Sequence, residues 1–384
     1  MENYNGCTPV FTDVIILAGG IGERLWPLST KKHPKQFIKT EKGSFFQMAL
    51  RRAVLLQPSS SILAVTRREF KDIAAEQCAD AKNLLTKNQF KFLRDKLTIL
   101  PEPMPKHTAA AVQYALAFIE RGRDSLDSGA ARNSSILVLT SDHIIETDEQ
   151  FLAACGNAVP SIAENYFVCF GICPLFPATG FGYFETGKEI TPLVREILSF
   201  KEKPDESTAK AFIARGNYWW NSGMFAFNKD FFQSEIKKYV RGLYAPFEAL
   251  LKTKPREGYC NDFRFVAQWR RLNDVYEQTE AVSIDCAIAE KTCRARCVIA
   301  EFSWDDIGSW DVFADRLPSR QDNAVLIESG NCSVYSDIPV ALCGVSDLIV
   351  SIQDGKALVM KKGKSALIRD VAQHMEHYEG EKKF

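Results

Sequence analysis

Hydrophobic residues occur along this chain in short runs that are separated by longer amphipathic stretches. Five runs rich in branched and aromatic residues fit strands that are buried on both faces of a parallel sheet. They lie at 14–18, 61–66, 97–100, 134–140 and 166–173. The stretches between them at 45–56, 108–120 and 149–166 carry apolar residues at helical spacing. The alternation predicts an α/β fold with a mostly parallel sheet covered by helices on both faces.

The pattern changes after residue 320. Short apolar pieces follow, each closed by small or polar residues: "NAVLIESG", "CSVYSD", "VALCGVSD", "LIVSIQDG" and "KALVMKK". Their even spacing predicts a small all-β unit, in the form of a coil of stacked turns. We therefore predict a catalytic domain over 1–290, a junction over 291–320 and a small β-rich domain over 321–384.

Composition and charge narrow the class of protein. The chain has 384 residues, which favours two domains over one. Its 48 Lys and Arg balance 48 Asp and Glu, so a general attraction to nucleic acid or membrane is not expected. The 11 cysteines are scattered and contain no CxxC pair, which favours reduced thiols over a disulfide scaffold. No apolar run approaches the roughly 18 residues of a membrane span, so we expect a cytoplasmic protein.

The most informative segment is "LAGGIGERLWPLSTKKHPKQF" (17–37), which follows the first predicted strand. Its glycines are Gly19, Gly20 and Gly22. Glycines at the end of a strand let the backbone N–H groups converge on an anion, and Arg24 and Lys35 add two positive charges. The third glycine of a dinucleotide fingerprint would fall at Leu25, and no GK[ST] follows, so neither that motif nor a P-loop is present. The loop predicts a polyphosphate site and disfavours a Rossmann oxidoreductase.

This segment resembles the signature of the sugar-nucleotide pyrophosphorylases, and its "RLWPLS…PKQF" form is similar to that of the mannose-1-phosphate guanylyltransferases. Further stretches agree in order: "TSDHII" (140–145), "PATGFGYFE" (177–185), "FKEKPD…WWNSGMFAF" (200–227) and "SIDCAIAEKT…WDDIGSW" (283–310). The resemblance covers residues 13 to 360. It implies a Rossmann-like nucleotide-diphospho-sugar transferase domain followed by a β-helix-like C-terminal domain. The implied reaction transfers GMP from GTP to mannose 1-phosphate, giving GDP-mannose and pyrophosphate.

The resemblance also implies which residues form the site. Nucleotide-binding residues would be Leu17, Ala18, Gly19, Gly20, Gly22, Thr108 and Ser141. Catalytic residues would be Arg24, Lys35 and Lys203. The sugar phosphate would contact Gly182, Glu202, Lys203 and Asn221. Asp142 and Asp285 would bind Mg²⁺, because a hard ion between phosphates is commonly held by one or two carboxylates.

Three alternatives to this function stay open. Lys106 and His107 replace an Arg-Asn pair that is usual in the family, so another base is one alternative. Another sugar 1-phosphate, such as a manno-heptose 1-phosphate, is the second. The third is a non-catalytic sugar-nucleotide sensor, which would be expected to lose a charged site residue, whereas this chain keeps all of them. A homodimer through the C-terminal unit is implied by the resemblance.

Overall fold

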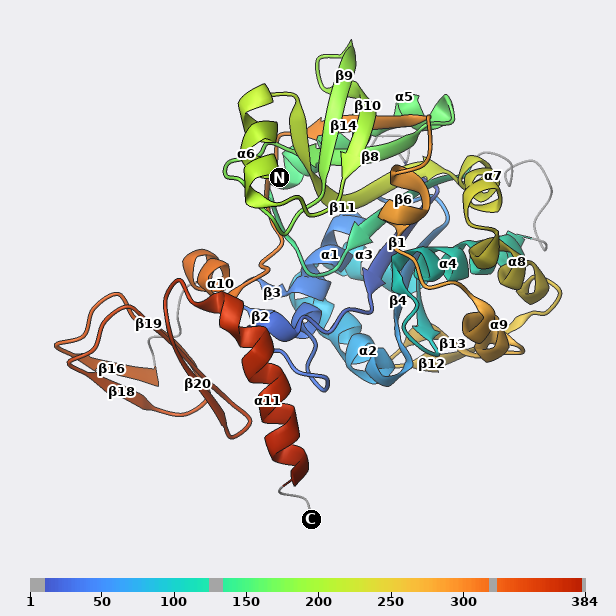
Figure 1. The fold of residues 1–384 in the computed structure, drawn as a ribbon. Coiled ribbons are helices and arrows are strands. Elements are labelled where there is room, and N and C mark those ends of the chain that lie inside the picture. Colours follow the sequence, from blue (N-terminus) through green and yellow to red (C-terminus); the bar gives the residue numbers. More distant parts are fainter. Residues whose placement is uncertain (1–10, 124–133, 318–322, 382–384) are drawn as a thin grey trace. The chain divides into compact units, whose positions relative to one another are not determined.

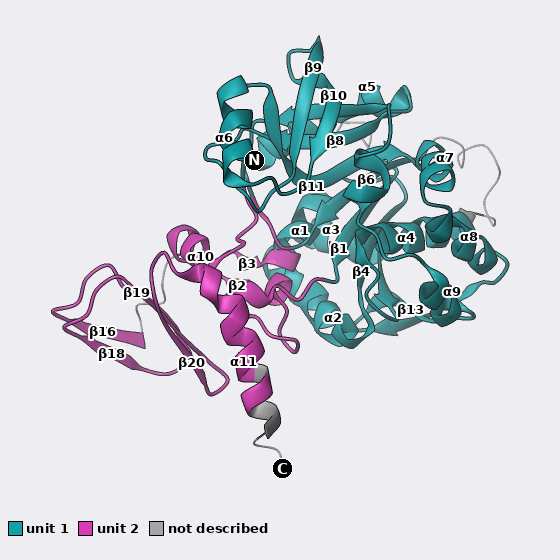
Figure 2. Ribbon diagram, in the orientation of Figure 1, with its two compact units in different colours: residues 1–19, 47–141, 145–304 teal, residues 20–46, 142–144, 305–384 magenta. Residues whose placement is uncertain are grey.

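A computed structural model describes residues 11–123, 134–317 and 323–381 of the chain (Figure 1). The chain divides into two compact units, both discontinuous in sequence (Figure 2). The larger unit comprises Met1–Gly19, Gln47–Ser141 and Ile145–Trp304. The smaller unit comprises Gly20–Phe46, Asp142–Ile144 and Asp305–Phe384. The domain boundaries at 290 and 320 stay a prediction.

The larger unit is built on an eleven-stranded sheet of order β12-β13-β5-β4-β1-β6-β11-β8-β14-β10-β9. Its strands are β1 (Asp13–Ala18), β4 (Ser61–Arg67), β5 (Leu97–Glu102), β6 (Ser135–Thr140), β8 (Phe167–Ile172), β9 (Tyr183–Thr191), β10 (Val194–Lys201), β11 (Tyr218–Asn228), β12 (Pro255–Cys260), β13 (Phe263–Trp269) and β14 (Ala295–Ala300). Only β10, β11 and β12 run against the other eight. The mostly parallel sheet is therefore confirmed, and β1, β4, β5, β6 and β8 coincide with the five predicted runs.

Helices cover both faces of this sheet. They are α1 (Phe45–Leu55), α2 (Lys71–Asp80), α3 (Lys87–Lys96), α4 (His107–Arg123), α5 (Asp148–Ala163), α6 (Glu206–Arg215), α7 (Lys229–Tyr239), α8 (Arg241–Leu250) and α9 (Leu272–Gln278), followed by the π-helical turn η6 (Asp285–Ala289). On β1, Ile15 belongs to the apolar cluster around Tyr114 of α4. Val14 and Ile16 point to the opposite face and are fully buried as well. This burial on both faces explains why the strand sequences are uninterrupted apolar runs.

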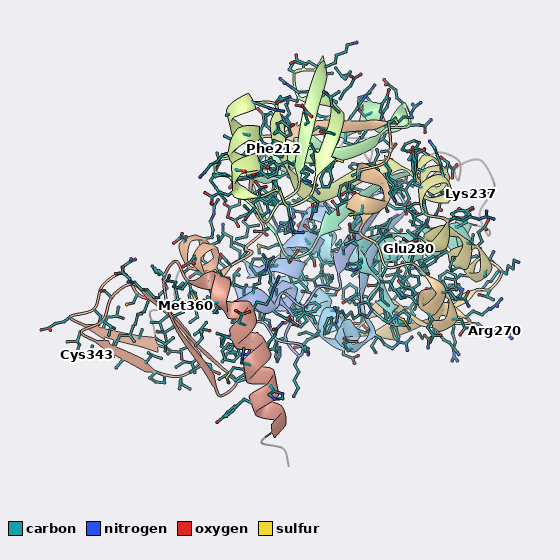
Figure 3. All side chains as sticks on the ribbon, in the orientation of Figure 1. Phe212, Lys237, Arg270, Glu280, Cys343 and Met360 are labelled. Carbon is teal, nitrogen blue, oxygen red and sulfur yellow. The ribbon has the colours of Figure 1, made fainter. Side chains whose placement is uncertain are left out.

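The C-terminal part of the smaller unit is a coil of two stacked turns. Its strands are β16 (Ala324–Ile327), β17 (Ser333–Ser336), β18 (Val340–Cys343), β19 (Leu348–Gln353) and β20 (Lys356–Lys361). Two parallel pairs, β16 with β18 and β17 with β19, both join residues that are 16 positions apart, and so does the bridge between Gly330 and Ser346. A constant offset means that each turn lies on the preceding one, which confirms the predicted coil. Figure 3 labels Cys343 at the end of β18 and Met360 on β20.

The smaller unit also contains the glycine-loop segment. Its remaining elements are the 3₁₀ turns η1 (Glu23–Leu25), η2 (Lys35–Phe37) and η8 (Ser365–Leu367), the strands β2 (Lys39–Thr40) and β3 (Gly43–Ser44), and the helices α10 (Trp310–Arg316) and α11 (Ile368–Glu381). Trp310 is fully buried, packs on Tyr335 of β17, and donates its indole N–H to the Trp26 carbonyl at 2.8 Å. This indole therefore joins the segment after the glycine loop to α10 and the coil.

Two further short strands are β7 (Ile144–Glu146) and β15 (Ser303–Asp305). Within the described residues, no helix combines the length and the apolar character that crossing a membrane requires.

Candidate active site

The glycine loop of the smaller unit is folded tightly against Lys35. Gly22 precedes η1 with φ +73°, a backbone conformation that is strained for residues with a Cβ. A Cβ at Gly22 would lie 2.4 Å from the Cβ of Lys35. The Lys35 N–H donates to the Ile21 carbonyl at 2.9 Å, and the Ser29 hydroxyl donates to the Gly22 carbonyl at 2.5 Å. Both the backbone conformation and the close approach therefore require glycine here.

The same geometry gives a prediction with a control inside the loop. Gly22→Ala should lower the free energy of unfolding by about 2–4 kcal/mol, because it adds left-handed strain and an overlap with Lys35. Gly20→Ala should change it by less than about 0.5 kcal/mol, since a Cβ there meets nothing within 4 Å. Urea unfolding of both variants and the wild type measures the difference. Equal stability of the two variants would contradict the loop geometry.

The two cations of the loop have different environments. The Lys35 side chain is 6% exposed, and its ammonium donates to Asp142 Oδ2 at 3.0 Å and to the Asp306 carbonyl. Burial raises the pKa of Asp142, but the Lys35 ammonium and His143 outweigh it and lower that pKa to about 2, so the carboxylate is ionised. Arg24 is exposed and, among the described residues, has no hydrogen bond or ion pair. Arg24 can therefore take an incoming anion without first breaking a protein contact.

In the larger unit, the carbonyl groups at the end of β1 are held by neighbouring strands. The Ser141 N–H and hydroxyl both donate to the Leu17 carbonyl, at 3.2 and 2.7 Å. The Gly19 carbonyl accepts a hydrogen bond from Arg67 Nε at 2.8 Å. The first glycine of the loop thus leaves the sheet in a fixed orientation. Ser141 lies beside Leu17, as expected for two residues at neighbouring parallel strand ends.

A residue that the sequence did not single out, Glu102, lies next to this glycine. Its side chain is buried, and Oε1 accepts a hydrogen bond from the Tyr276 hydroxyl at 2.9 Å. Oε2 would lie 3.2 Å from a Cβ at Gly19. Burial raises the pKa of Glu102 to about 7, although Tyr276 and Arg67 both act to lower it. The sequence signal is a Glu two residues after the apolar run 97–100, but its burial cannot be read from residue order.

This raised pKa gives a pH-dependent prediction. Glu102 binds its proton more tightly in the folded protein than in the unfolded chain. The bound proton therefore adds fully to the free energy of unfolding below about pH 4.5, and this stabilisation is lost as the pH rises through about 7. The free energy of unfolding changes by about 3 kcal/mol over this pH range. Glu102→Gln, which still accepts from Tyr276, should be more stable than the wild type by up to about 3 kcal/mol at pH 8. Unfolding both proteins between pH 5 and 8 tests this, and parallel stability curves would contradict it.

The segment at 106–108 braces the chain that leads to Asp285. The Thr108 hydroxyl accepts the N–H of Ile284 at 2.9 Å. The Lys106 ammonium donates to the Thr279 carbonyl at 3.0 Å, just after α9. Lys106 therefore has a structural contact of its own. A nucleotide-binding role for Thr108 stays a prediction.

Five of the predicted residues form one connected cluster in the larger unit. Asn221 Nδ2 donates to Asp285 Oδ1 at 2.6 Å, and the Asn221 N–H donates to the Gly182 carbonyl at 2.8 Å. A Cβ at Gly182 would lie 2.7 Å from Glu202 Oε2. Glu202 Oε1 in turn pairs with the Lys203 ammonium. Residues from three of the separate sequence stretches, 177–185, 200–227 and 283–310, thus lie in one connected cluster.

The electrostatics of this cluster suit a phosphate and a hard cation. Lys203 has φ +44°, and its side chain is 61% exposed. Its ammonium is therefore accessible to an anion. Burial, and next the charge of Glu202, raise the pKa of Asp285, while Asn221 and Lys203 oppose this effect. A cation beside Asp285 would offset the burial of its charge. Asp142 and Asp285 both offer carboxylate oxygens, the donors that Mg²⁺ prefers. They belong to different compact units, so their pairing stays a prediction.

Comparison with known proteins identifies the family. The family model described as nucleotidyl transferase matches residues 13–322. The chain belongs to the nucleotidyl transferase family. Mannose-1-phosphate guanylyltransferase of Sinorhizobium fredii is 33% identical over 90% of this chain, which spans 62% of that relative's length. Alginate biosynthesis protein AlgA of Pseudomonas aeruginosa is 32% identical over 94% of this chain and 72% of its own.

A solved structure agrees with this assignment to the nucleotidyl transferase family. The crystal structure of mannose-1-phosphate geranyltransferase from Thermus thermophilus matches with a TM-score of 0.76 and 28% identity, over 95% of this chain and 99% of its own. The predicted Rossmann-like fold and the nucleotidyltransferase class of enzyme are confirmed. Enzymes of this family generally use a divalent metal.

Proposed function

We propose that the protein transfers GMP from GTP to mannose 1-phosphate and releases pyrophosphate. In this reaction a phosphate oxygen of the sugar attacks the α-phosphorus of GTP. A new P–O bond forms as the bond between that phosphorus and the oxygen bridging to the β-phosphate breaks, and the electron pair leaves with pyrophosphate. The relatives named as mannose-1-phosphate guanylyltransferases support the substrates. The observation that carries the proposal is the cluster in which Asn221 links Gly182 to Asp285.

Each predicted residue has a role in the proposal that follows from its contacts. The accessible ammonium of Lys203 binds the attacking phosphate, and Glu202 accepts hydrogen bonds from sugar hydroxyls. Asn221 holds Asp285 in one orientation, because its amide oxygen is itself bound by the Gly223 N–H at 3.0 Å. The exposed Arg24 binds triphosphate oxygens next to the loop glycines.

Mg²⁺ is the divalent metal we propose, held by the carboxylates of Asp142 and Asp285. When bound, it would neutralise charge on the phosphates. Lys35 keeps Asp142 ionised, which a metal ligand requires.

Pyrophosphate release from the purified protein, measured with four NTPs and with mannose and manno-heptose 1-phosphates in Mg²⁺, tests the function. The highest rate is expected with GTP and mannose 1-phosphate. A higher rate with another base or sugar would keep the reaction and replace the substrate. If the protein bound GDP-mannose but showed no turnover, the proposed enzymatic function would be wrong, and a non-catalytic sugar-nucleotide sensor would be favoured.

The homodimer and the cytoplasmic location remain parts of the proposal. Val325 and Ile327 of β16 are exposed, and so is Ile338 before β18. This apolar surface on the coil supports self-association. Sedimentation of Val325→Asp beside the wild type tests it, with a shift toward monomer expected and an unchanged state contradicting it. The ten described cysteines are all free thiols, which supports a reducing compartment.

A further inference from the structure

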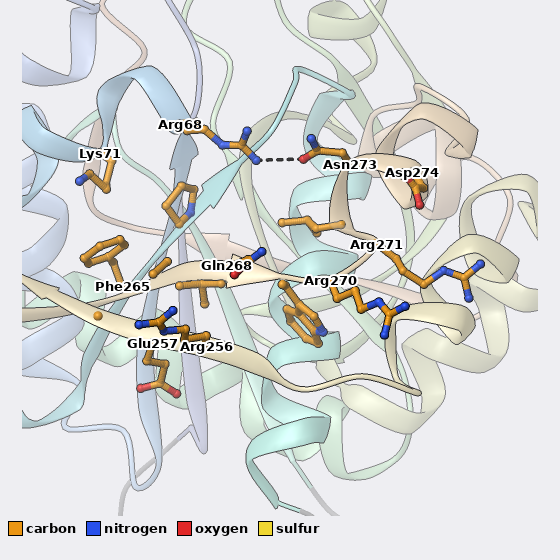
Figure 4. A pocket seen from close by; sticks show the side chains of 16 residues that line it. Arg68, Lys71, Arg256, Glu257, Phe265, Gln268, Arg270, Arg271, Asn273 and Asp274 are labelled. Carbon is orange, nitrogen blue, oxygen red and sulfur yellow. Dashed lines mark hydrogen bonds between the residues drawn. The ribbon is translucent and has the colours of Figure 1, made fainter.

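The larger unit contains a cavity of about 850 Å³ (Figure 4). It is lined by the chain just after β4, by the β12–β13 hairpin and by the start of α9. None of the predicted site residues lines it. Its volume lies in the range of sites that bind nucleotide-sized small molecules.

Positive charge dominates the lining of this cavity. The cations are Arg68, Lys71, Arg256, Arg270 and Arg271, and the acids are Glu257 and Asp274. Within the described part of the chain, Arg256, Arg270 and Arg271 have no ion-pair partner. Because the whole chain is neutral, this local excess of unpaired arginines is a specific feature of the cavity.

The arrangement in the cavity matches a ligand with separated phosphates. Arg68 is oriented by a hydrogen bond to Asn273 Oδ1 at 3.0 Å, and Lys71 stacks over the Phe265 ring at 4.6 Å (Figure 4). Arg270 comes from the opposite end of the lining from Lys71 (Figure 4). Guanidinium groups bind phosphate oxygens bidentately, so cations at separate positions can hold more than one phosphate. Apolar groups such as Pro101 and Leu272 also line the cavity.

The walls of this cavity are connected to the first loop glycine. Arg68 follows Arg67, whose Nε holds the Gly19 carbonyl at 2.8 Å. Helix α9 carries Tyr276, which holds Glu102 at 2.9 Å, and Glu102 lies against Gly19. A ligand that orders Arg68 and α9 therefore acts on both groups that fix this glycine.

We propose that this cavity is a second, regulatory site that binds a nucleotide-sized small molecule carrying two or more phosphates. Its occupant acts on Gly19 through Arg67 and through the Tyr276–Glu102 contact. This site is separate from the proposed transfer reaction, and its test requires no turnover.

Inorganic tripolyphosphate is the probe, titrated calorimetrically into the full chain. The wild type should bind it at two sites. Arg256→Ala/Arg270→Ala should weaken one site at least about tenfold, and Arg24→Ala should weaken the other. Arg271 is left unchanged, so that the cavity variant and its control each lose two positive charges. The matched control is Arg241→Ala/Lys254→Ala, which removes the same charge from exposed positions outside the cavity lining.

Two results would overturn this regulatory site. One is a wild type with a single tripolyphosphate site that Arg24→Ala removes. The other is binding by the cavity variant that equals binding by the control. Amide hydrogen exchange tests the coupling between the cavity and Gly19. In the Arg24→Ala protein, tripolyphosphate should slow exchange at 17–19. Adding Arg256→Ala/Arg270→Ala to that protein should abolish the slowing. Unchanged exchange with the cavity occupied would refute the regulatory role. If guanylyl transfer failed, these binding results would still stand.

Discussion

Replacing Lys203 by Ala is expected to raise the KM for mannose 1-phosphate about 100-fold and to leave the KM for GTP within about twofold. Two charge-assisted hydrogen bonds from an ammonium to a phosphate are together worth roughly 3 kcal/mol, which corresponds to this factor. The backbone should not respond, because Ala and Lys are equally strained at φ +44°. Initial rates with each substrate varied against saturating levels of the other measure both constants.

A matched control for Lys203 lies two residues earlier. Lys201 is also an exposed cation, at the end of β10, so Lys201→Ala removes the same charge and should leave both KM values unchanged. Lys203→Arg should recover part of the loss, since it restores the charge with a different shape. An equal rise in both KM values would show that Lys203 serves the whole site and would refute its assignment to the sugar phosphate.

The features that the sequence predicts well are those set by local pattern. The strands at 14–18 and 61–66 appear as β1 and β4, because burial on both faces requires a continuous apolar run. The coil after residue 320 was predicted from evenly spaced short strands, and the 16-residue register gives the physical reason for that spacing. The hydrogen bonds among Gly182, Asn221 and Asp285 bring residues of three predicted stretches together, and the binding roles of these residues stay predictions.

The features that the sequence could not predict depend on distant partners. Lys35 looks like a free cation in the sequence, but Asp142 and the Asp306 carbonyl, which lie far along the chain, bind its ammonium. Glu102 looks like an ordinary strand-end acid, and only burial beside Tyr276 raises its pKa. The arginines of the cavity come from 68, 256 and 270–271, so no single sequence window contains the cluster.

Contacts between residues far apart in the sequence also explain why the two units are discontinuous. The glycine-loop segment follows β1 directly, yet Trp310 binds the Trp26 carbonyl and packs on Tyr335 of the coil. A contact across so many residues has no local signature. Resemblance to a family can supply such long-range information, because it carries over which distant motifs belong to one site. It could not supply Glu102, which lies outside the five motifs that carried the resemblance.

The second large effect is expected for Asp285→Asn, which should lower kcat about 1000-fold, as the loss of a metal-holding carboxylate does. The free energy of unfolding of the Asp285→Asn protein should either fall by less than about 1 kcal/mol or rise. Asn keeps an oxygen for the Asn221 amide, and it removes a charge that is buried beside the Glu202 carboxylate. Loss of activity without loss of stability therefore separates a chemical role from a structural one. Steady-state rates and urea unfolding on the same preparations provide both values.

Two further measurements make the Asp285 test specific. Glu290→Gln removes an exposed carboxylate just after the same π-helical turn and should retain near-normal rates. Raising the Mg²⁺ concentration should recover part of the Asp285→Asn activity but should not affect Glu290→Gln, because only a weakened metal site responds to mass action. If Asp285→Asn kept kcat within tenfold of the wild type, Asp285 would not be a metal ligand. Its hydrogen bond to Asn221 would then serve only to join β11 to η6.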